Sequence, residues 1–186
     1  MPQDLPLFLG QLIRQPHKVV ALAPSSEALA RKMALAVPPG DGPIIELGAG
    51  TGKITSALLE SGIAESDLHA FELSDEFVDH LQDHFEGVNI HHAPAQHMGK
   101  LGLKGARAVV SGLPLLSMPN KIQFSILKAT RAALAQNGVF VQFTYGHTPP
   151  VAERLRNTFG LTWTRSQIVW GNLPPARVYT FRFRQH

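Results

Sequence analysis

Cysteine is absent from the 186-residue sequence. This excludes disulfides, thiolate zinc sites and a thiol nucleophile, so any chemistry must use oxygen or nitrogen side chains or a bound cofactor. Charged residues are also few, at 17%, against 44% hydrophobic residues. A chain of this length and composition is expected to form one main domain with a large hydrophobic core.

Long hydrophobic runs are missing as well. No apolar stretch approaches the roughly 20 residues needed to span a bilayer. The N-terminus also lacks the basic, apolar and small-residue segments of a secretion signal. From these absences we expect the protein to be cytoplasmic.

The few charges are unevenly distributed along the chain, whose formal net charge is +3. Acidic residues crowd the segment 72–86, whereas basic residues lie near both ends, at Arg14, Lys18, Arg31, Lys32, Arg177, Arg182 and Arg184. If the two ends meet in space, they form a basic face that favours an anionic surface, either lipid headgroups or nucleic acid. An ordinary scatter of surface cations is the alternative.

The most informative segment is 44–60. An apolar pair is followed by the motif ELGAGTG (46–52) and then by a helix-like stretch. The pattern predicts a strand, a glycine turn and a helix start, and the alternating glycines leave backbone amides open to a ligand. A nucleotide-like ligand is the functional interpretation, and a tight structural turn is the alternative.

Two common glycine motifs do not fit this segment. The dinucleotide pattern Gly-x-Gly-x-x-Gly, read from Gly48, requires a third glycine where the chain has Lys53. A phosphate-binding P-loop requires glycine at Leu47 and Ser or Thr at Ile54. A ligand without a phosphate group therefore suits the turn better.

A carboxylate follows the next apolar run. The stretch 68–71 ends in Glu72, 20 positions beyond Gly52. In a doubly wound sheet, an acid at the carboxyl end of a strand can accept hydrogen bonds from ribose hydroxyls. We therefore predict that Glu72 is a ribose ligand; a solvated acid that opens the following helix is the alternative.

Apolar runs alternate with helical patterns along the rest of the chain, which indicates β-α units around a mostly parallel sheet. We predict strands at 44–47, 68–72, 88–91, 108–112, 138–144, 162–169 and 177–183. Helices are predicted at 53–59, 75–84, 121–135 and 151–158.

Residues 1–37 are predicted to form an N-terminal helical extension, followed by the main domain at 38–186. Apolar residues between Leu5 and Ile13 recur at helical spacing, and Ser25 or Ser26 is suited to cap a second helix that includes Met33. The first helix either covers the active site or dips its apolar face into a membrane interface.

The acid-x-Gly-x-Gly-x-Gly motif resembles the first motif of class I S-adenosylmethionine-dependent methyltransferases. Four further stretches resemble one family among them, the bacterial phospholipid N-methyltransferases that convert phosphatidylethanolamine towards phosphatidylcholine. These stretches are VALAPSS (20–26), VVSGLPLL (109–116), VQFTYG (141–146) and NLPPARV (172–178). The resemblance implies an α/β, Rossmann-like fold with a seven-stranded, mostly parallel sheet, a closing antiparallel strand pair and helices on both faces.

The resemblance also implies S-adenosylmethionine as the cofactor and suggests the residues that contact it. These residues are Glu46, Gly48, Gly50, Thr51, Gly52, Glu72, Leu73, Ala95, Gln96 and Ser111. The residues expected to orient the substrate amine are Ser111, Gly112, Leu113, Pro114 and Tyr145. Candidates for the lipid headgroup are Tyr145, His147 and Arg177, with a half-buried aromatic and a solvated strand residue as the alternative interpretations of Tyr145 and Arg177.

One position departs from the pattern of the class. Pro94 stands where many relatives carry an acid that accepts from the adenine amine. The backbone of Ala95 and the side chain of Gln96 are the proposed substitutes, and a neutral hydrogen bond is worth only about 0.5–1.5 kcal/mol. His91 and His92 lie nearby, but adjacent strand residues point to opposite faces, so we predict no metal site.

RNA adenine dimethylases share the glycine turn but carry an Asn-hydrophobic-Pro-aromatic motif where this chain has Ser111 to Pro114 followed by Leu115. Enzymes that methylate a base hold the flipped ring by stacking, and Leu115 and Leu116 offer an aliphatic wall instead.

We therefore predict an N-methyltransferase that acts on phosphatidylethanolamine or its partly methylated forms. It would be peripheral at the inner face of the membrane and bound to anionic lipid, with nucleic acid disfavoured; the alternatives are an RNA adenine N6-methyltransferase and a noncatalytic lipid- or cofactor-binding regulator.

Overall fold

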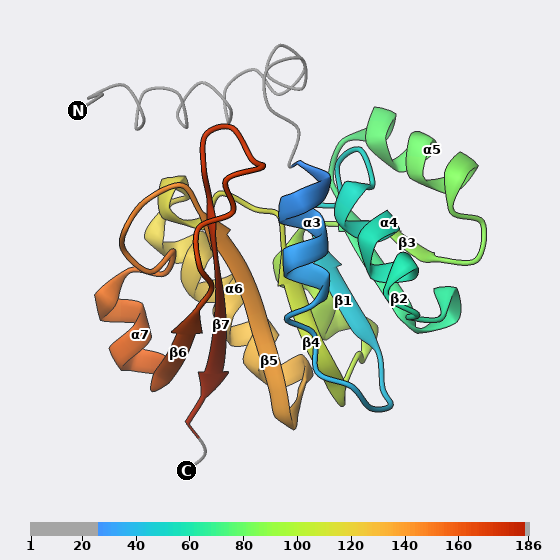
Figure 1. Cartoon of the computed structure of the whole chain (residues 1–186). Coiled ribbons are helices and arrows are strands. Elements are labelled where there is room, and N and C mark those ends of the chain that lie inside the picture. Colours follow the sequence, from blue (N-terminus) through green and yellow to red (C-terminus); the bar gives the residue numbers. More distant parts are fainter. Residues whose placement is uncertain (1–25, 185–186) are drawn as a thin grey trace.

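The apolar runs form a single seven-stranded sheet in the order β3-β2-β1-β4-β5-β7-β6. The computed structural model describes residues 26–184. The strands are β1 (Ile44–Leu47), β2 (Leu68–Glu72), β3 (Asn89–His92), β4 (Ala106–Ser111), β5 (Leu134–Thr144), β6 (Leu161–Arg165) and β7 (Arg177–Phe183). β1 to β5 are parallel, and β7 is antiparallel to both of its neighbours (Figure 1). The predicted Rossmann-like fold is confirmed.

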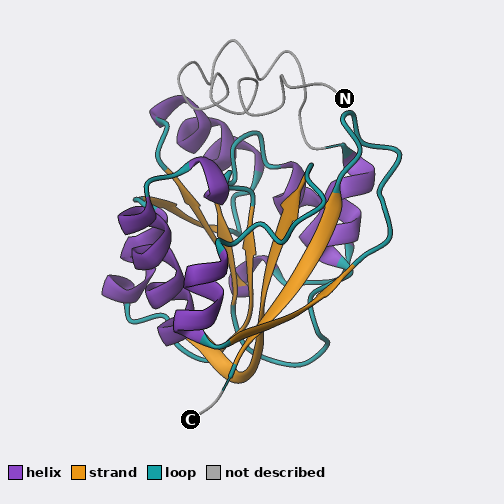
Figure 2. Ribbon diagram, turned by 90° about the vertical axis from the view of Figure 1, so that its left-hand side faces the viewer, coloured by secondary structure: helices purple, strands orange, loops and turns teal. Residues whose placement is uncertain are grey.

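Helices cover both faces of the sheet (Figure 2). α3 (Glu27–Ala34), α4 (Lys53–Glu60) and α5 (Asp75–His84) share one hydrophobic core with their face of the sheet. α6 (Asn120–Ala133), α7 (Glu153–Phe159) and the 3-10 helix η2 (Ala95–Leu101) share the second core on the other face. The short 3-10 helices are η1 (Glu65–Asp67) and η3 (Leu115–Ser117). None of the helices in residues 26–184 has the length and hydropathy to cross a membrane.

Several boundaries differ from the sequence prediction, and the two largest differences, of four residues each, are at the start of β5 and the end of β6. β5 begins at Leu134 instead of 138, because Leu134 already pairs with Ala106 before the register shifts and Val139 pairs with Ala108. β6 ends at Arg165 instead of 169, because the Ser166 hydroxyl replaces a strand acceptor and takes the N–H of Val178 at 3.0 Å. A side chain that replaces a backbone group in the strand hydrogen bonds can end a strand even where the apolar pattern continues.

The N-terminal extension is described only from Ser26 onward. Ser26 caps α3, since its hydroxyl accepts from the Leu29 N–H at 3.2 Å. The first predicted helix, Ser25, Arg14 and Lys18 lie outside the described residues.

One edge of the sheet gathers the candidate functional segments. The carboxyl ends of β1, β2, β4 and β5 face this edge, because these strands are parallel. The loop that joins β6 to β7 returns to the same edge (Figure 1). In open α/β sheets, ligands bind at this edge where the strand order reverses, which here is between β1 and β4.

Candidate active site

The glycine turn between β1 and α4 has three glycines with positive φ, of 73° at Gly48, 55° at Gly50 and 77° at Gly52. A Cβ at Gly48 would lie 2.5 Å from the Leu113 side chain, and one at Gly52 would lie 2.5 Å from the Phe85 ring. A Cβ at Gly50 would meet no atom of the described part of the chain within 4 Å. The outer glycines therefore serve close packing, while Gly50 faces space into which a ligand can enter.

Glu72 is bound to this turn through its carboxylate. Its Oε2 accepts from the Gly50 N–H at 2.8 Å, and its Oε1 accepts from Leu73 and Ser74 at 2.7 and 3.0 Å. A carboxylate has about four lone-pair sites, so these three donors leave one free. Glu72 can accept one ribose hydroxyl as it stands, and a second if the Gly50 N–H is released.

Glu46 lies beneath the turn and is fully buried. Burial raises the pKa of its carboxyl to about 7; hydrogen bonds from Thr55 lower it, and the nearby Glu72 raises it further. The Thr55 hydroxyl donates to Oε2 at 2.7 Å, whereas Oε1 has no hydrogen-bond partner within residues 26–184. An unpaired buried carboxylate oxygen is costly, and its position at the glycine turn fits a cationic ligand group nearby.

The turn after β4 packs directly against the glycine turn. The Gly112 N–H donates to the Leu47 carbonyl at 2.8 Å, and a Cβ at Gly112 would lie 2.8 Å from the Gly48 carbonyl oxygen. Ser111 is fully buried, and its hydroxyl accepts from the Leu113 N–H at 3.2 Å. Ser111 therefore lies below this turn and shapes it, while the next three residues form its surface.

An apolar pocket opens beside this turn, with a volume of about 100 Å³. Its lining comes from the carboxyl ends of β4 and β5 and the segments that follow, at Gly112, Leu113, Pro114, Leu115, Leu116, Ser117, Phe143, Thr144, Tyr145 and Pro150. The two leucines predicted to form an aliphatic wall do line it. Leu113 both lines the pocket and packs on Gly48, so the two halves of the site share one wall.

Two buried polar side chains hold this pocket in shape. Neither was assigned a role from the sequence. Gln142 on β5 donates to the Leu113 carbonyl at 2.8 Å, and its own Oε1 has no partner among the residues that the structure describes. Asn172 hydrogen-bonds Tyr145; burial raises the Tyr145 pKa, and this hydrogen bond lowers it. Both residues interrupt apolar or proline-rich stretches, and this is the signal in the sequence that could have identified them.

The remaining predicted residues lie around the glycine turn and the apolar pocket. Leu73 is exposed next to Glu72, while Ala95 and Gln96 begin η2 after β3. Arg177 pairs in register with Thr144, which lines the pocket, and donates to the Ser166 carbonyl at 3.4 Å. His147 is exposed and does not line the pocket, although its carbonyl accepts from Tyr179.

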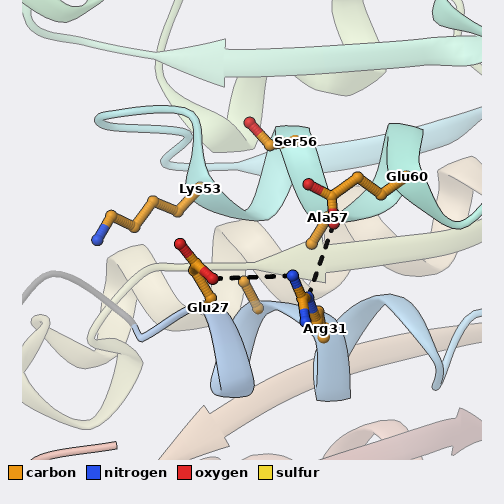
Figure 3. Close-up of a pocket in the computed structure, with 7 residues that line it drawn as sticks. Glu27, Arg31, Lys53, Ser56, Ala57 and Glu60 are labelled. Carbon is orange, nitrogen blue, oxygen red and sulfur yellow. Dashed lines mark ion pairs between the residues drawn. The ribbon is translucent and has the colours of Figure 1, made fainter.

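A second cavity, of about 230 Å³, lies between α3 and α4 (Figure 3). Arg31 lies 3.7 Å from both Glu27 and Glu60 in this cavity, and the Lys53 amine points away from that pair (Figure 3). All of these side chains are well exposed, so the ion pairs add little stability. The cavity includes neither the glycines of the turn nor Glu72, and we assign it no role.

Histidines gather on β2 and β3 without forming a metal site. His69 Nδ1 lies 3.0 Å from His91 Nε2, and burial lowers the pKa of both rings. His92 lies 3.4 Å from Asp75. Within residues 26–184, no group of three or more His, Asp or Glu side chains is arranged to hold a metal ion.

Comparison with known proteins gives one informative sequence relative. No protein-family model matches the chain. The ornithine lipid N-methyltransferase of Singulisphaera acidiphila is 29% identical over 190 residues, which cover 97% of this chain and 96% of the relative.

Solved structures give the same class of fold. The 1,6-didemethyltoxoflavin-N1-methyltransferase of Burkholderia thailandensis, bound to S-adenosylhomocysteine, matches with a TM-score of 0.70 at 17% identity, over 100% of this chain and 91% of that one. A glycopeptide N-methyltransferase complexed with S-adenosylhomocysteine matches with a TM-score of 0.68 at 14% identity, over 92% of this chain and 98% of that one. A methyltransferase of Corynebacterium glutamicum matches with a TM-score of 0.67 at 13% identity, over 96% and 100%. These findings confirm the predicted resemblance: the chain has the fold of class I S-adenosylmethionine-dependent methyltransferases, and it is similar over nearly its whole length to a lipid N-methyltransferase.

Proposed function

We propose that this protein transfers a methyl group from S-adenosylmethionine to the amine of a membrane lipid. The observation that carries the proposal is the shared wall at Leu113, which packs on Gly48 and lines the apolar pocket. A cofactor held by the glycine turn and Glu72 would present its methyl group next to that pocket. S-adenosylmethionine supplies an electrophilic methyl group on a positively charged sulfur.

The donor groups of the site suit this cofactor. Glu72 offers a free lone pair to a ribose hydroxyl, and the surroundings of Gly50 are open. The Oε1 of Glu46 is unpaired among the described residues, and a cationic ligand group nearby would favour the ionised form of this carboxyl. The turn has no Lys-Ser/Thr pair for phosphate binding, and S-adenosylmethionine has no phosphate to bind.

The pocket supplies conditions for an amine nucleophile. A free primary ammonium has a pKa of about 10 and is mostly protonated at neutral pH. Burial among Leu113, Leu115 and Phe143 would lower that pKa, because an apolar wall disfavours the cation. With S-adenosylmethionine bound, the neutral nitrogen would form the N–C bond as the S–C bond breaks, which leaves S-adenosylhomocysteine, and the nitrogen would then lose a proton to solvent.

Positioning by the chain is the main catalytic contribution in this proposal. The Gly112 carbonyl and the Tyr145 hydroxyl are proposed to orient the amine, and Leu113 and Pro114, whose carbonyls already accept hydrogen bonds, are proposed to shape the turn around it. Arg177 is proposed to pair with an anionic part of the lipid headgroup, such as a phosphate or a carboxylate. It lies on β7, directly across from the pocket-lining Thr144 on β5. His147 is proposed to contact the outer part of the headgroup.

Two lipid amines are candidates for the substrate. The four sequence stretches that resemble phospholipid N-methyltransferases favour phosphatidylethanolamine or its partly methylated forms. The similarity to the Singulisphaera acidiphila enzyme favours the amine of ornithine lipid. For either lipid, we propose that the protein acts from the cytoplasmic side as a peripheral protein on anionic membrane.

The test is a methylation assay on vesicles that contain either lipid. We expect S-adenosylhomocysteine to form together with methylated lipid, detected by thin-layer chromatography and mass spectrometry, with one lipid clearly preferred. The Glu72→Ala variant should lose turnover, and Glu76→Ala, which removes an exposed acid from α5, should retain it. The absence of turnover on every aminolipid, or methylation of structured RNA instead, would contradict the proposal.

A further inference from the structure

The loop between β6 and β7 exposes large hydrophobic side chains at the active-site edge. Trp170 is 74% exposed and Leu173 is 83% exposed. A third exposed hydrophobic residue, Leu116, lies at the same edge on the rim of the apolar pocket. Burying such side chains in the core is favourable, so their exposure indicates a contact that residues 26–184 do not make among themselves.

The exposure of this loop is built into the fold. Asn172, which stands between the two exposed residues, is buried. Its Oδ1 accepts from the Ser26 N–H at 2.8 Å, and its Nδ2 donates to the Pro174 carbonyl at 2.7 Å. Val169 and Ala176 close the base of the loop through a backbone pair. The loop is therefore anchored from within, and Trp170 and Leu173 are held outward from it.

The composition of the loop suits a lipid interface better than it suits bulk solvent or a protein–protein interface. The segment 166–176 contains no charged residue, while Arg165 and Arg177 stand immediately on either side of it. Indole rings favour the headgroup level of a bilayer, and flanking basic residues are attracted to anionic lipid. A short uncharged tip between two arginines can thus enter the interface while the cations stay among the phosphates.

The loop is also physically joined to the pocket. Asn172 hydrogen-bonds Tyr145, and Tyr145 lines the pocket together with Leu116. A membrane surface that receives Trp170 and Leu173 would therefore lie close to the pocket mouth. A lipid amine could reach the pocket from that surface without its acyl chains leaving the bilayer.

We propose that this interfacial loop, 166–176, is a membrane-insertion element that docks the active-site edge on an anionic bilayer. The proposal rests on the proposed function, since it supplies the route by which a lipid amine reaches the pocket. The occupant of the exposed surface is the lipid interface, and a second copy of the chain is an outcome that the test distinguishes.

The two tryptophans of the chain make a direct test possible. In Trp163→Phe, the remaining indole is Trp170; in Trp170→Phe, it is Trp163, which lies mid-strand on β6 with the Arg156 guanidinium 4.9 Å from its ring. The full chain is mixed with vesicles of phosphatidylcholine and phosphatidylglycerol, which contain no substrate amine. We expect the Trp170 emission to shift to the blue and to be quenched by brominated acyl chains, while the Trp163 emission stays unchanged.

A paired substitution measures the consequence for binding. Trp170→Ser with Leu173→Ser should weaken vesicle binding about tenfold or more, because two apolar contacts with the bilayer are lost. Leu35→Ser removes an equally exposed leucine from the other end of α3 and should leave binding unchanged. Methylation of detergent-dispersed lipid should be the same in the paired variant and the parent, whereas methylation of vesicle lipid should fall with binding.

Other results would overturn the proposal. If the protein binds vesicles but the Trp170 emission is unchanged, the membrane contact lies elsewhere. If the emission shifts with protein concentration in the absence of lipid, the loop contacts a second copy. Failure to methylate any dispersed lipid would refute the proposed function instead, and it would leave the vesicle-binding result to be judged independently.

Discussion

The two halves of the site are constructed differently. The proposed cofactor half consists of the glycine turn and Glu72, and it is held together by backbone N–H groups that donate to the Glu72 carboxylate and to the Phe71 carbonyl. The pocket half is apolar, and buried amide side chains on β5 and in the β6–β7 loop hold its shape. This difference indicates that the first half is specified by a short motif, while the second depends on contacts between distant segments.

The largest effect expected from this comparison distinguishes two glycines of the same turn. Gly52→Ala should destabilise the fold by about 3 kcal/mol or more, because its positive φ and close contacts with the Phe85 ring and Leu81 both oppose the new Cβ. Gly50→Ala should cost only about 1–2 kcal/mol from its φ, since its surroundings are open. Chemical denaturation measures both, and equal destabilisation would contradict the assignment of Gly50 to a ligand-facing position.

The buried carboxyl of Glu46 is expected to make stability depend on pH. A carboxyl whose pKa rises from 4.5 to about 7 on folding binds its proton more tightly in the folded protein. Its favourable contribution is full below pH 4.5 and is lost as the pH rises towards 7, by up to about 3 kcal/mol.

The Glu46→Gln variant isolates this effect from the titration of other groups. It should be more stable than the parent at pH 8 and of similar stability at pH 5, as measured by thermal unfolding across this range. A parent protein whose stability rises relative to the variant over the same range would show that Glu46 is ionised in the folded protein at low pH.

Removing the carboxylate at Glu72 tests the cofactor half alone. Glu72→Ala should weaken S-adenosylmethionine binding about 100-fold, because hydrogen bonds donated to a charged acceptor are worth about 1.5–3 kcal/mol each. Calorimetric titration measures the affinity, and Glu76→Ala is the matched control. Unchanged affinity in Glu72→Ala would leave the ribose assignment without support.

The smallest expected effect concerns the pocket half. Gln142→Leu removes the donor to the Leu113 carbonyl and should reduce kcat/KM for the lipid about tenfold, corresponding to about 1–2 kcal/mol. Cofactor affinity should be unchanged, since Gln142 makes no hydrogen bond to the glycine turn. Equal losses in lipid turnover and cofactor affinity would show that the two halves are not separable.

The sequence was sufficient for the parts of the site that depend on local pattern. The spacing from Gly52 to Glu72 predicted that both lie at one sheet edge, and β1, β2, β7 and α5 have the predicted bounds. Gln142 and Asn172 were not assigned a role, because their partners are 29 and 146 residues away in the chain. The burial of Ser111 was not predictable for the same reason, since it depends on how two turns pack together.

The central claim is that the glycine turn and Glu72 hold the cofactor with its methyl group towards the apolar pocket. The most direct measurement is a crystal structure with S-adenosylhomocysteine bound. We predict that the ribose hydroxyls lie within hydrogen-bonding distance of the Glu72 carboxylate and that the sulfur faces the pocket between Leu113 and Tyr145. A complex in which the ligand leaves the surroundings of Gly50 and Glu72 empty would contradict the account.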